Sequence, residues 1–206
     1  GVPLWKLRTG KLSEGENADD FPKIGHAMGV LAEAPIYIDD TAMSNLMEMR
    51  TKARRLQSEH GVGMIVVDYL QLLEGSAGIE NRVQQVAEIT RGLKGLAKEL
   101  NVPVLALSQL SRATEMRHPP IPKLADLRES GTIEQDADVV MFIYRPAMHD
   151  RDLPPEDQHR AEIHVAKHRN GPTGVVNLYF DNELASFKNM ERQRAPVDAF
   201  ATASPF

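Results

Sequence analysis

The feature that most constrains this chain is a run of four apolar residues, Met64 to Val67, that ends on an acidic side chain, Asp68. A run rich in Ile and Val is typical of a central strand of a parallel sheet that is buried on both faces. Ligands of open parallel α/β sheets bind just outside the carboxyl ends of the strands, so Asp68 stands where a metal-bound phosphate would meet the protein. A hydrophobic run that ends in Asp is also common as an ordinary strand end or turn.

A second strand follows after a long helix. Apolar residues recur at steps of three and four between residues 79 and 100, which predicts an amphipathic helix. Residues 102–107 then form a second apolar strand, which runs into Ser108 and Gln109. The right-handed crossover rule brings the ends of both strands to the same rim of the sheet. We therefore expect Asp68 and Gln109 to lie side by side on that rim.

The rest of the chain predicts further elements and one long loop. Periodicity and capping residues predict helices over residues 19–34 and 44–59, a third buried strand over 137–145 and a hairpin of segments 161–167 and 175–181. The Asn-Gly turn of that hairpin exposes Lys167, His168 and Arg169 at its tip. Between the second and third strands, residues 111–136 form a loop with several cations: Arg112, Arg117, His118 and Lys123. A long loop of this kind at a sheet rim is more often functional than decorative.

Composition bounds the class of protein. The 206 residues, 42% hydrophobic and 26% charged, suit one globular domain with extensions. The absence of cysteine removes disulfides and thiolate chemistry, and it favours a cytoplasmic location. A formal net charge of −5 argues against a protein that coats nucleic acid through a basic surface, although a few Arg side chains and backbone N–H groups can still hold phosphates.

Several familiar motifs are missing from the sequence. A phosphate-binding loop of the form G-x-x-x-x-G-K-[ST] occurs nowhere, since Leu12 follows the pair Gly10 and Lys11. The seven His residues show no metal-ligand spacing, and no G-x-S-x-G motif anchors a hydrolase triad.

Three stretches taken together resemble one family. Residues 65–72, 104–112 and 126–138 are similar, in order and spacing, to successive motifs of the RecA-like motor domain of DnaB-type replicative helicases. The resemblance implies an α/β fold with a RecA-like P-loop NTPase core, in which helices flank a mostly parallel sheet and an antiparallel hairpin lies at the C-terminal end. It covers most of residues 1–190, which we expect to be part of the motor domain, with 191–206 as a flexible tail.

The resemblance also implies roles for single residues. Asp68 is similar to the acid that holds the Mg²⁺ of Mg-ATP through water, and Gln109 to the sensor of the terminal phosphate. Lys167 and Arg169 resemble the catalytic cations offered to the nucleotide of the adjacent subunit, where Arg169 acts as an arginine finger. The stretch that includes Arg128, Glu129 and Gly131 resembles the loop that grips single-stranded DNA. The alternatives are a salt bridge of Arg128 to Asp126 or Glu134 and a solvated tip for Arg169.

One departure from the family sets the expected organisation. The phosphate loop, its strand and the catalytic Glu should precede residue 1, so we interpret the chain as a C-terminal part that alone binds ATP poorly. The resemblance implies a homohexamer that translocates 5′ to 3′ on single-stranded DNA, with a primase and a helicase loader as partners. A non-catalytic single-strand-binding or assembly module and another RecA-like ATPase are the alternatives.

Overall fold

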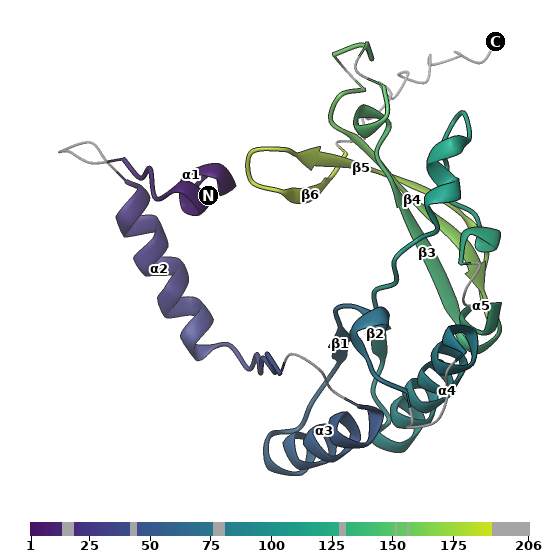
Figure 1. Cartoon of the computed structure of the whole chain (residues 1–206). Helices are drawn as coiled ribbons and strands as arrows, with labels where there is room; N and C mark the ends of the chain where they lie inside the picture. The colour runs from purple at the N-terminus through teal and green to yellow at the C-terminus, as the bar shows by residue number, and fades with distance from the viewer. Residues whose placement is uncertain are drawn as a thin grey trace, which may run out of the picture.

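The structure is a computed structural model that describes residues 1–13, 19–41, 45–75, 81–127, 131–150, 152–155 and 157–190. The predicted tail, 191–206, therefore lies outside the described residues, as do Arg128 and Glu129. The helices are α1 (Leu4–Thr9), α2 (Asp20–Glu33), α3 (Leu46–His60), α4 (Arg82–Leu100) and α5 (Gly131–Asp136). The strands are β1 (Ile65–Val67), β2 (Val104–Ala106), β3 (Val139–Tyr144), β4 (Arg160–His168), β5 (Gly174–Asp181) and β6 (Ser186–Asn189). Figure 1 shows their arrangement.

The predicted parallel pair is confirmed. Strands β1 and β2 pair in parallel, with Val67 opposite Ala106, and α4 connects them. The Asn81 side chain caps α4 by accepting a hydrogen bond from the Val83 N–H, and Asn101 ends the helix in a left-handed conformation. Helix α3 is capped in the same way by Asn45, whereas Ser44, the predicted cap, lies outside the described residues.

The prediction that these strands are buried on both faces is wrong. Helices α3 and α4 lie on one side of the pair, so Val67 is buried, but Val66 is 58% exposed and Leu105 is 43% exposed. The third apolar run shows the same alternation, because Val140 and Phe142 of β3 are buried between exposed neighbours. An apolar run reveals the strand, but it does not reveal whether a second layer covers the other face.

The C-terminal sheet is larger than predicted. The hairpin of β4 and β5 is confirmed, but β3 and β6 flank it, so a four-stranded antiparallel sheet of order β3-β4-β5-β6 forms. The α/β class is confirmed, while among the described strands only β1 and β2 pair in parallel, with one further parallel bridge between Asn45 and Glu74. The reason is that β3, which follows α5, pairs with β4 instead of extending the parallel pair.

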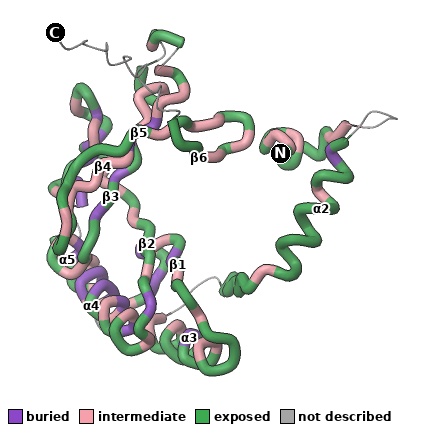
Figure 2. The backbone as a smooth tube through the Cα atoms, turned by 180° about the vertical axis from the view of Figure 1, so that it is seen from behind, coloured by how far each residue is buried: buried purple, intermediate pink, exposed green. Residues whose placement is uncertain are grey.

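One core joins the two sheets. It contains residues from η1 (Leu70–Leu72) and the helices and strands around it: Val67, Leu70, Leu73, Val86, Ile89, Leu93, Leu127, Ile133, Val140 and Phe142. In contrast, α2 stands away from this core and is exposed along most of its length (Figure 2). Helix α1 reaches the β5–β6 turn, where the Leu4 N–H donates to the Glu183 carbonyl at 2.8 Å. Among the described residues, no helix is both long and apolar enough to span a bilayer.

Candidate functional site

The ends of β1 and β2 form the first part of the candidate site. Asp68 follows β1 directly, and Gln109 lies three residues beyond β2; both side chains are exposed. The Gln71 side chain bridges the two strand ends, because its Nε2 donates to Ser108 Oγ at 3.2 Å and its Oε1 accepts from the Gln109 N–H at 3.3 Å. Nothing in the sequence pattern marked Gln71 as a site residue, although it lies three residues after Asp68. The rim that carries Asp68 and Gln109 is thus one hydrogen-bonded unit.

The chemistry of this rim suits a metal-bound phosphate. Asp68 makes no hydrogen bond or ion pair with any described residue, so its carboxylate is available to a ligand. The described part of the chain contains no group of three or more side chains that could hold a metal ion by themselves. A magnesium ion at Asp68 would therefore need oxygens from phosphate and water, which is its usual arrangement in nucleotide sites.

An ion pair between Arg117 and Asp126 holds together the segment that follows β2. Arg117 donates to both carboxylate oxygens of Asp126, and the Lys123 N–H donates to the same carboxylate at 2.7 Å. Asp126 is only 5% exposed, and its hydrogen bond from Arg117 keeps the pKa of the carboxyl below its usual value. From the sequence Arg117 was predicted only as one cation among several in a loop, because nothing in the residue spacing indicated its partner.

The predicted DNA-contacting residues are only partly visible. Arg128 and Glu129 lie outside the described residues, and Gly131 is the exposed first residue of α5. The carboxylate of Asp126, one of the two partners predicted for a salt bridge of Arg128, already pairs with Arg117 through both oxygens.

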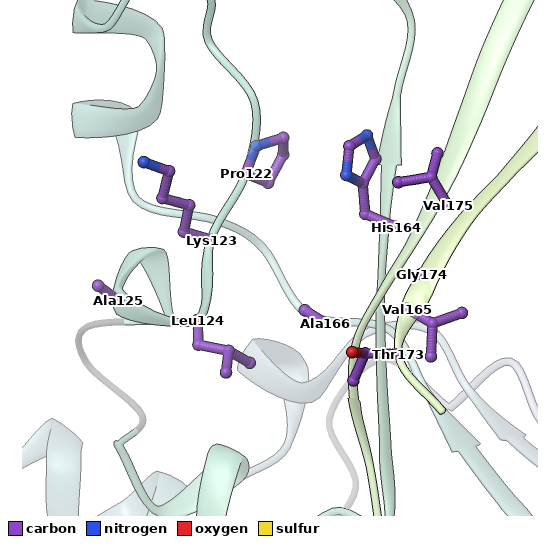
Figure 3. Close-up of a pocket in the computed structure, with 10 residues that line it drawn as sticks. All are labelled: Pro122, Lys123, Leu124, Ala125, His164, Val165, Ala166, Thr173, Gly174 and Val175. Atoms are coloured by element: carbon purple, nitrogen blue, oxygen red, sulfur yellow. The ribbon is translucent and has the colours of Figure 1, made fainter. Parts of the chain in front are cut away.

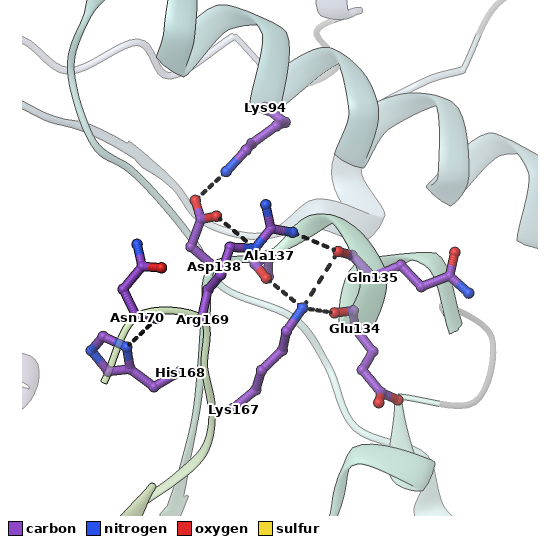
Figure 4. A network of polar contacts seen from close by, with 9 residues as sticks. All are labelled: Lys94, Glu134, Gln135, Ala137, Asp138, Lys167, His168, Arg169 and Asn170. Carbon is purple, nitrogen blue, oxygen red and sulfur yellow. Dashed lines mark hydrogen bonds and ion pairs between the residues drawn. The ribbon is translucent and has the colours of Figure 1, made fainter. Parts of the chain in front are cut away.

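The tip of the β4–β5 hairpin lies against the C-terminal end of α5 (Figure 4). Lys167 Nζ donates to the carbonyl oxygens of Glu134 and Ala137, the latter at 2.8 Å. Arg169 Nε lies 3.4 Å from a carboxylate oxygen of Asp138, and the Arg169 side chain remains 51% exposed. The hydrogen bond that Lys94 donates to Asp138 lowers the pKa of this carboxyl.

Three cations therefore gather at the end of α5: Lys94 of α4 and Arg169 of the hairpin tip contact the Asp138 carboxylate, and Lys167 contacts the carbonyl oxygens of Glu134 and Ala137. These contacts include none with Asp68 or Gln109, so the tip does not complete the rim of the same chain.

A shallow groove runs between the loop that follows β2 and the β4–β5 hairpin (Figure 3). Segments 122–125, 164–166 and 173–175 line about 500 Å³ of open space. The lining is mostly apolar, with Lys123 and His164 as its ionisable side chains. The groove lies apart from Asp68 and Gln109, so it forms no part of the candidate nucleotide site.

Comparison with known proteins gives consistent matches. The family model for the DnaB-like helicase C-terminal domain matches residues 1–189. The chain is 52% identical over 188 residues to the replicative DNA helicase DnaB of Geobacillus stearothermophilus and 50% identical over 188 residues to the replicative DNA helicase DnaC of Bacillus subtilis (strain 168). Each alignment covers 91% of this chain and 40% of the relative, so the chain spans about 40% of the length of these relatives.

Solved structures match as well. One of them, the structure of an ATPase domain, has a TM-score of 0.84 and 38% identity, and the match covers 92% of this chain and 66% of that one. A DnaB-like replicative helicase, described together with its interactions with primase, gives the same TM-score and identity over 92% of this chain and 46% of its own. These similarities confirm the predicted RecA-like α/β core.

Proposed function

Because this chain belongs to the family of DnaB-like helicase C-terminal domains, we propose that it is the motor part of a replicative DNA helicase. In this function a homohexameric ring hydrolyses ATP, moves 5′ to 3′ along one DNA strand and thereby separates the duplex during replication. The observation that carries the proposal is the rim on which Gln71 holds together the strand ends that bear an exposed carboxylate, Asp68, and an exposed amide, Gln109.

Within this proposal the rim binds Mg-ATP. Asp68 holds the Mg²⁺ through water, because this ion keeps several waters and takes few carboxylates from a protein. Gln109 contacts the terminal phosphate, and Gln71 fixes its main chain from the neighbouring strand end. When bound, the metal ion neutralises charge that develops on the phosphate oxygens.

The β4–β5 tip serves the nucleotide of the adjacent subunit. Arg169 is the finger, since half of its side chain is exposed. A guanidinium in this position can raise the rate of hydrolysis by ~10³–10⁵ because it stabilises the charge of the transition state. Lys167 belongs to the same tip, and its contacts with α5 support an additional role in keeping the tip in place within its own subunit.

Residues 1–190 form part of the motor domain in this proposal, and single-stranded DNA is bound by the stretch that contains Arg128, Glu129 and Gly131. Backbone donors and a few cations suffice for this contact, which suits a chain with a net charge of −5. A primase and a helicase loader are the proposed protein partners, and the absence of cysteine suits a cytoplasmic location.

The test uses a chimeric ring in which residues 1–189 replace the matching part of the Geobacillus stearothermophilus relative. We expect this chimera to hydrolyse ATP and to unwind a forked duplex, and Asp68→Asn to abolish both activities. Asp40→Asn is the matched control, because Asp40 is an exposed carboxylate with no partner among the described residues. A chimera that unwinds DNA equally well with Asn at position 68 would contradict the assignment.

One observation favours a second function for the 206 residues by themselves. The sequence contains no G-x-x-x-x-G-K-[ST] motif, so the chain alone lacks a loop that cradles the phosphates. A non-catalytic module that binds single strands or assembles rings would bind DNA equally well with and without ATP. Titration of the 206-residue chain with Mg-ATP and with oligo(dT) separates the two functions.

A further inference from the structure

The loop between β2 and α5 is closed on itself by one buried carboxylate. Asp126 accepts hydrogen bonds from Arg117 Nη1 at 3.0 Å, from Nη2 and from the Lys123 N–H at 2.7 Å. The same guanidinium donates to the Ile121 carbonyl at 3.0 Å, so Arg117 also fixes the chain that leads back to Asp126. A two-pronged pair between Arg and a carboxylate is among the most directional contacts that side chains form.

Asp126 also joins the two ends of the loop. Its carbonyl oxygen accepts a hydrogen bond from the Ser111 N–H at 3.1 Å. Ser111 lies two residues after Gln109, and Arg128 lies two residues after Asp126. This hydrogen bond brings the residues that follow Gln109 into direct contact with the residues that precede Arg128, although residues 112–125 separate them along the chain.

The residues on either side of this junction are anchored in the core. Leu127 is 5% exposed and belongs to the core cluster, and Leu110 and Leu124 pack against it. The junction therefore cannot slide freely, since any displacement of Ser111 is passed to Asp126 and Leu127 through packed atoms.

We propose that Arg117 and Asp126 are a positioning pair that makes the nucleotide rim at Gln109 and the DNA-contacting stretch that begins at Arg128 move as one unit. The inference deepens the proposed function and rests on it. Without the pair, a displacement of Gln109 would be lost through movement of residues 111–126. The contact with DNA would then no longer depend on whether the bound nucleotide is hydrolysed. Neither side chain touches ATP or DNA in this role.

The experiment uses the active chimeric ring, with ATP hydrolysis measured in the absence and in the presence of oligo(dT). We expect Asp126→Asn to leave the rate without DNA unchanged and to lower the stimulation by DNA about tenfold, the effect of losing a typical coupling between two sites. Arg117→Lys keeps the charge but loses the two-pronged geometry, and we expect it to lower the stimulation in the same direction without loss of folding. Arg112→Lys is the matched control, because Arg112 is exposed and has no partner among the described residues.

The outcomes are distinct. Stimulation equal to that of the unsubstituted chimera in both variants would overturn the inference, and so would an equal loss of both rates in Asp126→Asn and Arg117→Lys, which is the sign of a purely structural pair. An unsubstituted chimera without ATP hydrolysis contradicts the proposed function itself, and the inference falls with it.

Discussion

Lys167 donates a hydrogen bond from Nζ to the carbonyl oxygen of Ala137 at 2.8 Å, and this contact ties the β4–β5 tip to the end of α5. The Glu134 carbonyl accepts a second hydrogen bond from the same ammonium group. The last carbonyls of a helix lack partners within the helix and carry partial negative charge, so a cation there is stabilising. Lys167 thus has a structural role within its own chain.

We therefore expect Lys167→Met to lower the free energy of unfolding of the 206-residue chain by about 1–2 kcal/mol, because hydrogen bonds from a charged donor are lost. Hydrogen exchange should accelerate in α5, and urea unfolding gives the free energy. Lys11→Met is the control, since Lys11 is exposed and without a partner among the described residues. Unchanged exchange in α5 would show that the contact does not stabilise the helix.

The exposed finger leads to a second prediction. In the chimeric ring, Arg169→Ala should reduce ATP hydrolysis by ~10³ or more while nucleotide binding stays nearly intact, because the guanidinium acts on the transition state and not on the bound nucleotide. Hydrolysis is followed by phosphate release and binding by a fluorescent nucleotide. Normal turnover by the variant would refute the finger assignment.

Mixed rings test whether Arg169 acts on the neighbouring subunit. A ring that contains both Asp68→Asn and Arg169→Ala subunits has some interfaces where an intact Asp68 meets an intact Arg169, provided that the site is shared between chains. We then expect the mixture to regain part of the activity that each variant lacks alone. If both residues served one site within a single chain, mixing would restore nothing.

The Arg117 and Asp126 pair predicts how stability depends on pH. Because Arg117 lowers the pKa of Asp126 in the folded state, the stabilisation is fully present above the unfolded value of about 4 and is lost as the pH falls through the folded pKa. Asp126→Asn should cost about 1–3 kcal/mol near pH 7, since the partly buried Arg117 loses its charged partner. The difference in the free energy of unfolding between parent and variant should become smaller below about pH 4.

Urea unfolding of the 206-residue chain between about pH 3 and pH 8 measures this difference, with Asp40→Asn as the exposed control. A difference that stays constant down to the most acidic point would show that Asp126 is not paired as an anion.

The sequence predicts those parts of the fold that have a local signal. The periodicity of α4 and the apolar runs of β1 and β2 were sufficient to place Asp68 and Gln109 on one rim. The Arg117 and Asp126 pair was not predictable, because the segment that separates its members has no periodicity. The short strand β6 was missed for a similar reason, since its four residues, Ser186–Asn189, show no clear alternation of apolar and polar side chains.

The exposed faces of β1 and β3 were missed for a different reason. Covering a strand on its second side depends on another layer of the fold, and a run of Val and Ile is compatible with one covered face or two. The family of the protein was easier to predict than the burial of its strands, because three motifs in order were enough to indicate it.

Two glycines of α4 provide a matched pair for the packing of the core. A Cβ atom at Gly92 would overlap a methyl group of Leu46 in α3, whereas a Cβ atom at Gly95 would meet nothing within 4 Å. Both residues lie inside the same helix, where alanine is favoured over glycine by about 0.5–1 kcal/mol. Gly95→Ala should therefore raise the free energy of unfolding by about this amount, while Gly92→Ala should lower it by about 1–3 kcal/mol because Leu46 must leave its place against the core. Equal effects of the two substitutions in urea unfolding would mean that α3 and α4 do not pack as closely as the contact of Gly92 with Leu46 requires.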